Sequence, residues 1–311
     1  MEQNSGKAYF VAIATNLVLG YAYVSGKILL ESLTSLQILV ARFIIATITM
    51  YLISYKEKIP IVFKNEIYYF LAAFFGNVLS LWMNFAALKY TTATNVGLFG
   101  ALVPVITALL GYFILREKKL DRFFWLGCLL AMFGVMLIYL NGEGIKIHII
   151  GDAISFLNSI VASVYILLLG RIGKFSYSVL ATSRRITLYS LIIVSGLYLI
   201  SGHRGDWHQL CDKSVILNLF MLGVGSSGLC LVGYSYATSV LGVGKIGIFS
   251  YLCVIASVIY ASLILHDKMT WNIVLSTVLI IIGTVLSEHG GKSKNQIFRN
   301  TTNIKQKENY L

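Results

Sequence analysis

Two basic side chains, Arg42 and Lys245, interrupt long apolar stretches of the sequence. No aspartate or glutamate lies near the middle of any such stretch, and the nearest, Asp152, lies at the end of one. If the stretches cross a membrane, an ionisable side chain inside them is costly and faces a partner or a water-filled path. A cation without a nearby carboxylate predicts a site that attracts a carboxylate or another anionic group. The alternatives are pairing of Arg42 with helix-end carbonyls or Asp152, and extension of Lys245 to the membrane surface.

Uncharged polar and aromatic side chains recur at helical spacing in the same stretches. In the first stretch, Asn16, Gly20 and Tyr23 follow the i, i+4, i+7 pattern that brings side chains to one helix face. Such stripes indicate either a wet cavity or polar contacts between helices. Besides Arg42 and Lys245, the side chains that we expect to contact a bound small molecule are Asn16, Tyr23, Trp82, Asn84, Asn158, Tyr165, Tyr234 and Tyr251.

One proline and two glycines predict weak points in the helices. Pro104 removes a backbone hydrogen bond halfway along its stretch and can bend the helix there. Gly97 lies shortly before it, and Gly247 lies at the corresponding place in a later stretch. We expect Pro104, Gly97 and Gly247 to act as hinges, although close helix packing explains the glycines equally well.

Motifs for catalysis, metal binding or nucleotide hydrolysis are absent from the sequence. It contains no GxxxxGK[ST] loop, no Gly-x-Ser-x-Gly and no His-Glu-x-x-His. The five histidines fall between or after the apolar stretches, and the four cysteines form no CxxC pair. These patterns argue against an enzyme and predict neither a metal nor a cofactor. Without an ATP site, a transporter takes its energy from a gradient, an exchanged solute or the substrate itself.

The composition indicates which elements carry these residues. Of the 311 residues, 57% are apolar and 12% are charged, and the mean hydropathy is +0.79. A membrane-spanning helix needs about 20 mainly apolar residues. The sequence therefore predicts an all-α, polytopic membrane protein with ten transmembrane helices. The apolar segments lie at roughly 8–29, 35–55, 67–88, 93–115, 123–140, 149–169, 180–200, 215–237, 241–265 and 271–288.

Lysine and arginine predict the orientation, because cytoplasmic loops retain positive charge. With the N-terminus in the cytoplasm, most of the 25 basic residues fall on the cytoplasmic side. The net charge of +12 is then a topology signal, and no nucleic-acid partner is predicted. We expect both termini in the cytoplasm, a basic cytoplasmic tail at 289–311 and residence in a bacterial inner membrane. The first segment is expected to remain in the mature protein, because it lacks the features of a cleaved signal peptide.

The sequence repeats itself at an offset of 150 residues. The stretch from Ala87 to Lys118 aligns without gaps on the stretch from Ala237 to Lys268. Each half contains five predicted helices, an odd number, so the second copy enters the membrane from the opposite side. Two such inverted copies are a common scaffold of secondary transporters. We therefore expect one repeat at 1–142 and the other at 149–288.

The repeated stretch resembles a known family. The segment NFAALKYTTATNVGLFGALVPVITALLGYFILRE, from Asn84 to Glu117, and its counterpart ending in LILHDK are similar to the two EamA domains of the drug/metabolite transporter superfamily. Val254 and Asp267 depart from the pattern, in which proline and glutamate are common at these places. The resemblance implies ten helices, cytoplasmic termini, a central cavity and the movement of small metabolites, commonly the export of amino acids or related compounds.

Together these features predict a secondary transporter that moves a small polar metabolite, an amino acid or another carboxylate-bearing compound, out of the cell by alternating access. A nucleotide-sugar or sugar-phosphate exchanger of the same superfamily is the first alternative, and an intramembrane enzyme or lipid-handling protein is the second. The expected partners are a small-molecule substrate and the lipid bilayer. The sequence leaves open the substrate, the direction of net transport, the coupling ion or counter-substrate, the oligomeric state and the membrane in which the protein resides.

Overall fold

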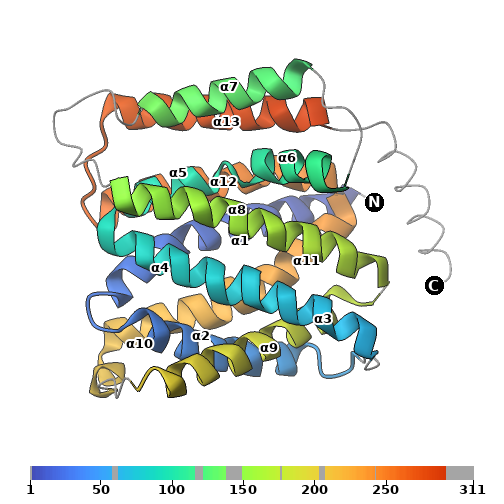
Figure 1. Ribbon diagram of the computed structural model, residues 1–311, viewed down its shortest axis with the longest axis vertical. Coiled ribbons are helices and arrows are strands. Elements are labelled where there is room, and N and C mark those ends of the chain that lie inside the picture. Colours follow the sequence, from blue (N-terminus) through green and yellow to red (C-terminus); the bar gives the residue numbers. More distant parts are fainter. Residues whose placement is uncertain are drawn as a thin grey trace.

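The protein is an all-helical bundle (Figure 1). The computed structural model describes residues 2–57, 62–115, 122–137, 149–175, 177–202, 207–241 and 243–291. No β-strand occurs within these residues, so the all-α prediction is confirmed. The reason is physical, because a helix satisfies its backbone hydrogen bonds internally and a bilayer core offers no water to replace them.

The described residues form α-helices, two π-helical segments and two short 3-10 turns. The π-helical segment η1 (Ala73–Leu79) joins α3 to α4, and η4 (Met221–Leu229) joins α10 to α11, so that each pair forms one continuous rod. The α-helices are α1 (Glu2–Leu29), α2 (Ser35–Ile53), α3 (Phe63–Ala72), α4 (Ser80–Tyr90), α5 (Ala93–Gly100), α6 (Val103–Leu115), α7 (Arg122–Leu137), α8 (Ile149–Ile172), α9 (Val179–Ile200), α10 (Lys213–Phe220), α11 (Cys230–Leu241), α12 (Val243–Ile264) and α13 (Trp271–Gly291). The 3-10 turns are η2 (Gly173–Phe175) and η3 (His208–Cys211).

Length and composition make most of these rods able to cross a bilayer. Large apolar side chains such as Phe10, Leu52 and Leu199 lie on the outer surface, which suits contact with lipid. The protein is therefore an integral, multi-pass membrane protein. The seven segments long and apolar enough to span are Gly6–Leu29, Ser35–Ile53, Phe63–Tyr90, Ala93–Phe113, Ile149–Phe175, Val179–Ile200 and Lys213–Tyr234, and three shorter apolar helices are Arg122–Gly134, Leu252–Ile264 and Trp271–Leu286.

Polar side chains explain where several helices begin. The Thr34 hydroxyl accepts a hydrogen bond from the Gln37 backbone N–H, and the Gln37 side chain accepts one from the Thr34 N–H, which makes a capping box for α2. Thr92 caps α5 through the N–H of Asn95, and Asp212 caps α10. Because each cap satisfies an N–H group that has no partner within its helix, it favours a turn at that residue.

The stretch that contains Pro104 is interrupted. α5 ends at Gly100 and α6 begins at Val103, and between them the N–H groups of Ala101 and Leu102 bond to carbonyls three residues earlier. Pro104 is the second residue of α6, in the first turn, where a helix tolerates a missing N–H. The local effect of the proline is thus a break between two helices.

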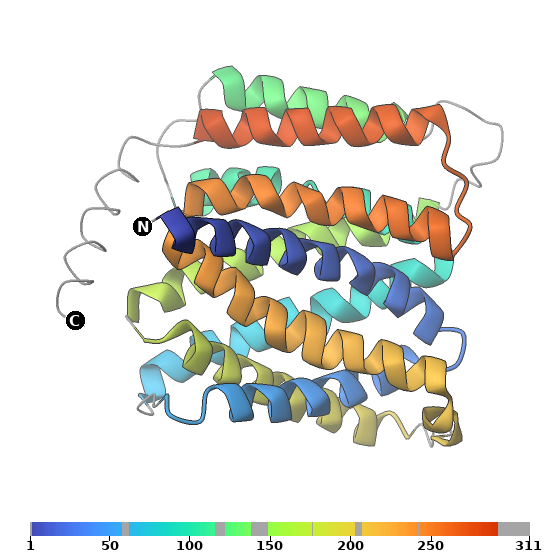
Figure 2. The same cartoon turned by 180° about the vertical axis from the view of Figure 1, so that it is seen from behind.

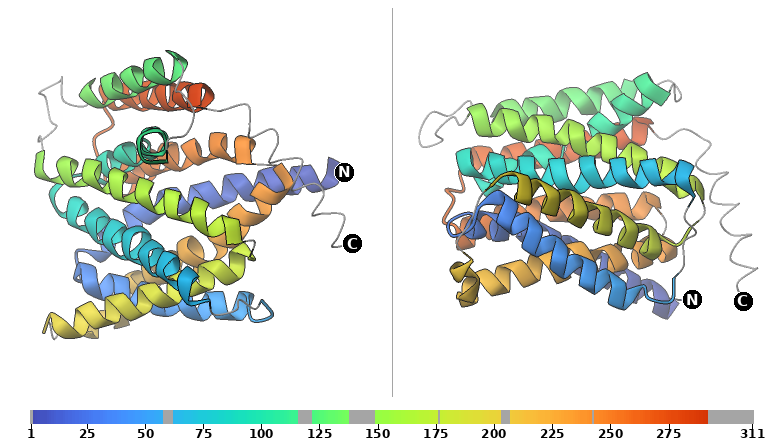
Figure 3. Two further views of the ribbon diagram at one scale, coloured as in Figure 1. Left: turned by 45° about the vertical axis from the view of Figure 1, so that its right-hand side comes forward. Right: turned by 60° about the horizontal axis from the view of Figure 1, so that its bottom comes forward.

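We call the end of the bundle at which α1 begins and α13 ends the near end. The opposite end, at which α1 ends and α8 begins, is the far end (Figure 1). α1 and α8 therefore run in opposite directions. α7 and α13 pack on each other at one side of the bundle, as Figures 2 and 3 show from other directions, and α2 packs on α9 at the other side.

Small residues allow the close contact between α7 and α13. A Cβ atom on Gly283 would lie 2.5 Å from the backbone nitrogen of Ala131 and 2.6 Å from the carbonyl oxygen of Gly127. A Cβ atom on Gly134 would lie 2.8 Å from a side-chain carbon of Ile280. Small residues at such places let membrane helices approach closely. The interface has no room for a larger side chain at either glycine.

We expect Gly283→Ala to lower the thermal unfolding midpoint of the detergent-solubilised protein, because the added methyl group must push the two backbones apart. Overpacking of this kind costs about 1–3 kcal/mol. Gly170→Ala in α8 is the matched control, since nothing lies within 4 Å of a Cβ atom there. Midpoints that fall equally in both variants would contradict the close packing of α7 on α13.

Candidate functional site

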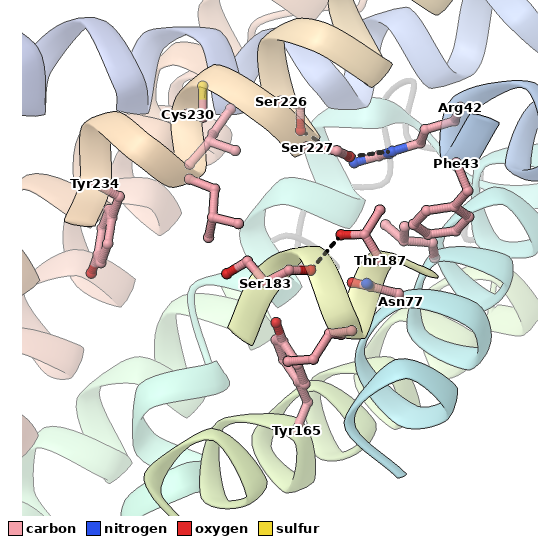
Figure 4. A pocket seen from close by; sticks show the side chains of 14 residues that line it. Arg42, Phe43, Asn77, Tyr165, Ser183, Thr187, Ser226, Ser227, Cys230 and Tyr234 are labelled. Atoms are coloured by element: carbon pink, nitrogen blue, oxygen red, sulfur yellow. Dashed lines mark hydrogen bonds between the residues drawn. The ribbon is translucent and has the colours of Figure 1, made fainter. Parts of the chain in front are cut away.

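A cavity of about 250 Å³ lies among helices from both halves of the chain. Its walls come from α1, α2, α8, α9 and the two rods that contain η1 and η4 (Figure 4). Ser183, in the second turn of α9, and Tyr234, in α11, extend it toward the near end of the bundle. The lining residues are Leu19, Arg42, Phe43, Asn77, Leu81, Tyr165, Ser183, Ile186, Thr187, Ser226, Ser227, Cys230, Leu231 and Tyr234.

Arg42 is the only charged side chain among the lining residues of the described chain. The residue is 7% exposed, its Nε donates to Oγ of Ser227 at 2.9 Å, and its Nη2 donates to Oγ of Ser226 at 3.2 Å (Figure 4). Both partners are neutral, and the ion pair between Arg185 and Glu66 lies elsewhere in the described structure. Buried charges are normally paired, because transfer out of water is costly. This guanidinium can therefore bind an anion in the cavity.

The glycines of η4 bring the two serines to Arg42. A Cβ atom on Gly223 would lie 2.6 Å from Cβ of Ile45, and one on Gly228 would lie 2.7 Å from Cγ2 of Thr49. Both neighbours belong to α2, so side chains at these two positions would push η4 away from α2. The close contact places the hydroxyls that lie between the two glycines against the arginine.

A glycine also shapes the opposite wall. A Cβ atom on Gly76 in η1 would lie 2.2 Å from the ring of Tyr165, so the tyrosine packs directly on the backbone of η1. The next residue, Asn77, donates its amide N–H to Oγ of Ser190 at 2.9 Å and thereby joins η1 to α9. These contacts hold the Tyr165 ring and the Asn77 amide at the cavity surface (Figure 4).

The two π-helical segments occupy corresponding places in the two halves. Asn77 in η1 and Ser227 in η4 are separated by the same offset of 150 residues that relates the repeated sequence, and both line the cavity. The pair Leu81 and Leu231 has the same offset and also lines it. π-Helical segments are often found at functional sites. Sequence periodicity did not predict them, because a single extra residue per turn leaves an apolar run apolar.

Three of the predicted contact residues, Arg42, Tyr165 and Tyr234, line the cavity. The lining residues that were not among the predicted contacts include Asn77, Ser183, Thr187, Ser226 and Ser227. A signal for the last two was present in the sequence, because the run Gly-Val-Gly-Ser-Ser-Gly at 223–228 combines adjacent hydroxyls with the small residues of a close helix contact.

Three predicted contacts are asparagines that bond within or between helices. Asn16 donates to the carbonyl oxygen of Ala12 in its own helix at 2.8 Å and is 1% exposed. Asn158 in α8 donates to Oδ1 of Asn84 in α4, also at 2.8 Å. The structure therefore places all three outside the cavity lining, in the helix-contact role that the sequence had left open.

The other predicted residues lie elsewhere or outside the described side chains. Trp82 is 46% exposed on the outer surface, and the Tyr23 hydroxyl packs near Gly100 of α5. A Cβ atom on Gly97 would lie 2.3 Å from Oγ of Ser257, which accounts for this glycine by close packing. The side-chain surroundings of Lys245, Tyr251, Pro104 and Gly247 lie outside the described part of the structure.

A polar network joins several helices at the far end. Oδ1 of Asp152 in α8 accepts hydrogen bonds from Oγ1 of Thr91 at 2.7 Å and from Nδ2 of Asn95 at 3.1 Å, so Asp152 is not the partner of Arg42. Lys27 in α1 donates to the carbonyl oxygens of Leu88 and Thr91. These contacts tie α1, α4, α5 and α8 together.

Asp267, in the loop between α12 and α13, adds a further part of the second half to this far-end network. Its Oδ2 accepts a hydrogen bond from Oγ1 of Thr94 at 3.1 Å. Burial raises the pKa of the Asp267 carboxyl, although hydrogen bonding by Thr94 and the charge of Lys27 act in the opposite direction. Polar contacts thus hold the bundle at the far end, away from Ser183 and Tyr234 of the cavity lining.

Different contacts hold the near end. Glu66 in α3 pairs with Arg185 in α9 and also accepts a hydrogen bond from the Tyr189 hydroxyl at 2.7 Å. Arg184 donates to the carbonyl oxygens of Ser54 and Glu57 at 2.6 and 2.7 Å. These bonds join α9 to α2 and α3, beside the part of the cavity that Ser183 lines.

Comparisons with known proteins agree with this architecture. The chain is 25% identical over 269 residues to the uncharacterized transporter YetK of Bacillus subtilis, covering 84% of this chain and 80% of that protein. It is 23% identical over 301 residues to a WAT1-related protein of Arabidopsis thaliana, covering 88% and 83%. It is 24% identical over 309 residues to an uncharacterized transporter of Clostridium kluyveri, covering 94% and 96%.

The fold has been seen before, and the family can be assigned. A crystal structure aligns with a TM-score of 0.61 and 16% identity, covering 92% of this chain and 96% of the other, which speaks to the fold alone. Residues 6–140 and 149–288 each match the EamA-like transporter family, so the resemblance carried by the repeated stretch is confirmed. The chain belongs to the EamA-like transporter family.

Proposed function

We propose that the protein is a secondary transporter that moves a small carboxylate-bearing metabolite, amino acids included, out of the cell by alternating access. The observation that carries this proposal is the buried guanidinium of Arg42, which has no ion pair in the described chain and faces a cavity between the two halves. Charges attract more strongly away from bulk water. The planar fork of arginine donors also matches the two oxygens of a carboxylate.

Helix packing supports an arrangement of two inverted repeats, at 1–142 and 149–288, that together supply ten membrane-spanning rods. α1 contacts α12 and α11, and its counterpart α8 contacts α5 and α4. α2 contacts η4, and its counterpart α9 contacts η1; the counterparts α2 and α9 contact each other, as do α7 and α13. Each of these helix contacts thus has an equivalent contact when every helix is replaced by its counterpart in the other half. The opposite directions of α1 and α8 agree with the inversion (Figure 1).

The position of the cavity supports alternating access. The cavity extends from Arg42 toward the near end, whereas the polar network of Lys27, Asp152 and Asp267 joins helices of both halves at the far end. For a bound molecule to leave at the far end, these contacts must separate while those at the near end close. Rocking of one repeat against the other around a fixed site does both.

The distribution of charge supports an orientation of the protein in the membrane. Basic residues gather at the near end, where Lys56, Lys174, Arg184 and Arg185 lie in or beside connections between helices. Cytoplasmic connections retain such charge, so we assign the near end, with both termini, to the cytoplasm of a bacterial cell. The cavity then receives its substrate from the cytoplasm, as an exporter requires.

The size of the cavity favours a small metabolite over the nucleotide-sugar alternative. Its volume of about 250 Å³ lies just below the ~300–1,000 Å³ of cavities that enclose drug-sized ligands. A nucleotide sugar also carries a diphosphate, and the described lining offers a single cation. A small acid matches both the volume and the charge.

Replacement of Arg42 tests the proposal. In proteoliposomes given a mixture of radiolabelled carboxylates on the outside, we expect Arg42→Gln to reduce uptake of the transported acid by at least about tenfold, since loss of a desolvated charge partner costs about 2–5 kcal/mol. Arg42→Lys keeps the charge but loses the planar fork, so we expect an intermediate loss.

Arg171→Gln is the matched control for these variants, because Arg171 is exposed at the end of α8 and does not line the cavity. It should transport as the unmodified protein does. Full transport by both Arg42 variants, or no transport of any carboxylate by the unmodified protein, would overturn the proposal.

Separation of the far end gives a second prediction. Thr94→Val removes the hydroxyl that donates to Asp267, so the far end should open more often. In a protein whose single cysteine is Cys230, which lines the cavity, labelling by an impermeant thiol reagent from the far side should rise about threefold or more, as expected for the loss of about 1 kcal/mol.

Thr277→Val is the control for this variant, because the Thr277 hydroxyl bonds to the Ile273 carbonyl within α13. Its labelling should match that of the single-cysteine protein. Far-side labelling that is the same with Thr94→Val and Thr277→Val would show that the Thr94–Asp267 bond does not hold the far end closed.

A further inference from the structure

We infer that the cavity selects a small organic anion of net charge −1, a monocarboxylate with an apolar body, over zwitterionic amino acids and over dianions. The inference rests on the proposed transport function and narrows its substrate class. Three features of the cavity carry it: the number of charges in its wall, the direction of its hydroxyl donors, and the character of the remaining surface.

The charge of the wall matches one negative charge. Arg42 contributes the single cation among the described lining residues, and its two hydrogen-bond partners are neutral serines. A bound monoanion neutralises this buried charge. A zwitterion leaves a net positive charge and adds an ammonium group, for which the described lining offers no carboxylate. A dianion leaves one negative charge without a cation.

The two serines are oriented to donate to the same group. The oxygens of Ser226 and Ser227 accept hydrogen bonds from Nη2 and Nε of Arg42, so each hydroxyl proton is directed elsewhere. Neither hydroxyl has another partner within the described chain. With the guanidinium, they form a cluster of donors for the two oxygens of one carboxylate. The contacts of Gly223 and Gly228 with α2 fix this cluster before a ligand binds.

The surface away from this cluster suits an apolar body. Leu19, Phe43, Leu81, Ile186 and Leu231 supply aliphatic and aromatic carbon to the wall. Two polar side chains of this surface already donate hydrogen bonds within the protein, the Asn77 amide to Ser190 and the Thr187 hydroxyl to the Ser183 carbonyl oxygen. An apolar chain or ring gains free energy on leaving water for such a surface. A second ionic group on the ligand would lose its hydration there.

Four ligands that share an isobutyl skeleton test the inference on the purified full-length protein. They are 4-methylpentanoate (net −1), leucine (zwitterionic), isobutylmalonate (net −2) and 4-methylpentanamide (neutral). In equilibrium binding by calorimetry, we expect 4-methylpentanoate to bind at least about tenfold more tightly than each of the others, the size expected when a buried charge gains or lacks its partner.

Substitutions in the cavity wall test which residues cause the preference for a monoanion. Arg42→Gln should abolish the preference for 4-methylpentanoate over the amide, and Ser226→Ala with Ser227→Ala should weaken its binding by about three- to tenfold, as lost hydrogen bonds to a charged group do. Ser201→Ala, an exposed site far from the cavity, should change nothing. Size-exclusion profiles and the Arg42→Lys variant guard against a loss caused by misfolding.

The outcomes separate this inference from the transport function. Arg42-dependent binding of leucine as tight as, or tighter than, that of 4-methylpentanoate would overturn the charge selectivity and leave an anion-recognising carrier intact. Equal binding of isobutylmalonate and 4-methylpentanoate would overturn it in the same way. Absence of Arg42-dependent binding for every carboxylate would overturn both.

Discussion

One buried positive charge sets the requirement that the rest of the site satisfies. Arg42 lies inside a membrane bundle with two neutral hydroxyls as its hydrogen-bond partners. A structural arginine at this depth would be expected beside a carboxylate, as Arg185 is beside Glu66 at the near end. Leaving the charge without such a partner costs stability, and under the proposed function a bound anion offsets this cost.

The local backbone serves this arrangement on both sides of the cavity. η4 lies close to α2 because Gly223 and Gly228 have no side chains. In the same way, the ring of Tyr165 packs on the backbone of η1 because Gly76 has no side chain. In each rod the π-helical turn lies at the level of the cavity and carries polar groups that line it. An extra residue in a helical turn rotates the following side chains around the rod, and such turns mark functional sites. The two rods thus change the direction of their side chains at the place where a ligand would bind.

The polar contacts at the two ends join different sets of helices. The far-end network joins α1, α4, α5 and α8 and reaches the loop before α13, whereas the near-end bonds join α9 to α2 and α3. Motion that loosens one set need not loosen the other. Individual contacts of this kind are worth about 1 kcal/mol each. A few of them can hold one end closed without making the closed state permanent, which a carrier requires.

Much of the fold could be predicted from the sequence, and less of the site. Apolar runs identify helices because the bilayer requires them, and a lone arginine in such a run is conspicuous, as Arg42 was. Which helices meet is a tertiary property, so helical spacing did not reveal that Asn158 bonds to Asn84 or that Trp82 faces outward. Spacing shows on which face of a helix a side chain lies, but it does not show which other helix that face contacts. The serines beside Arg42 depend on a contact between residues 185 positions apart in the chain.

Distances between spin labels test the central claim, that one site opens alternately to the two ends, most directly. Label pairs at Glu31 with Lys268 and at Lys56 with Lys174 report the far and near ends, and all four side chains lie outside the cavity lining. In lipid nanodiscs, addition of 4-methylpentanoate should lengthen the far-end distances and shorten the near-end distances in a fraction of molecules. Distances that stay unchanged at both ends, or that lengthen at both ends together, would contradict the account.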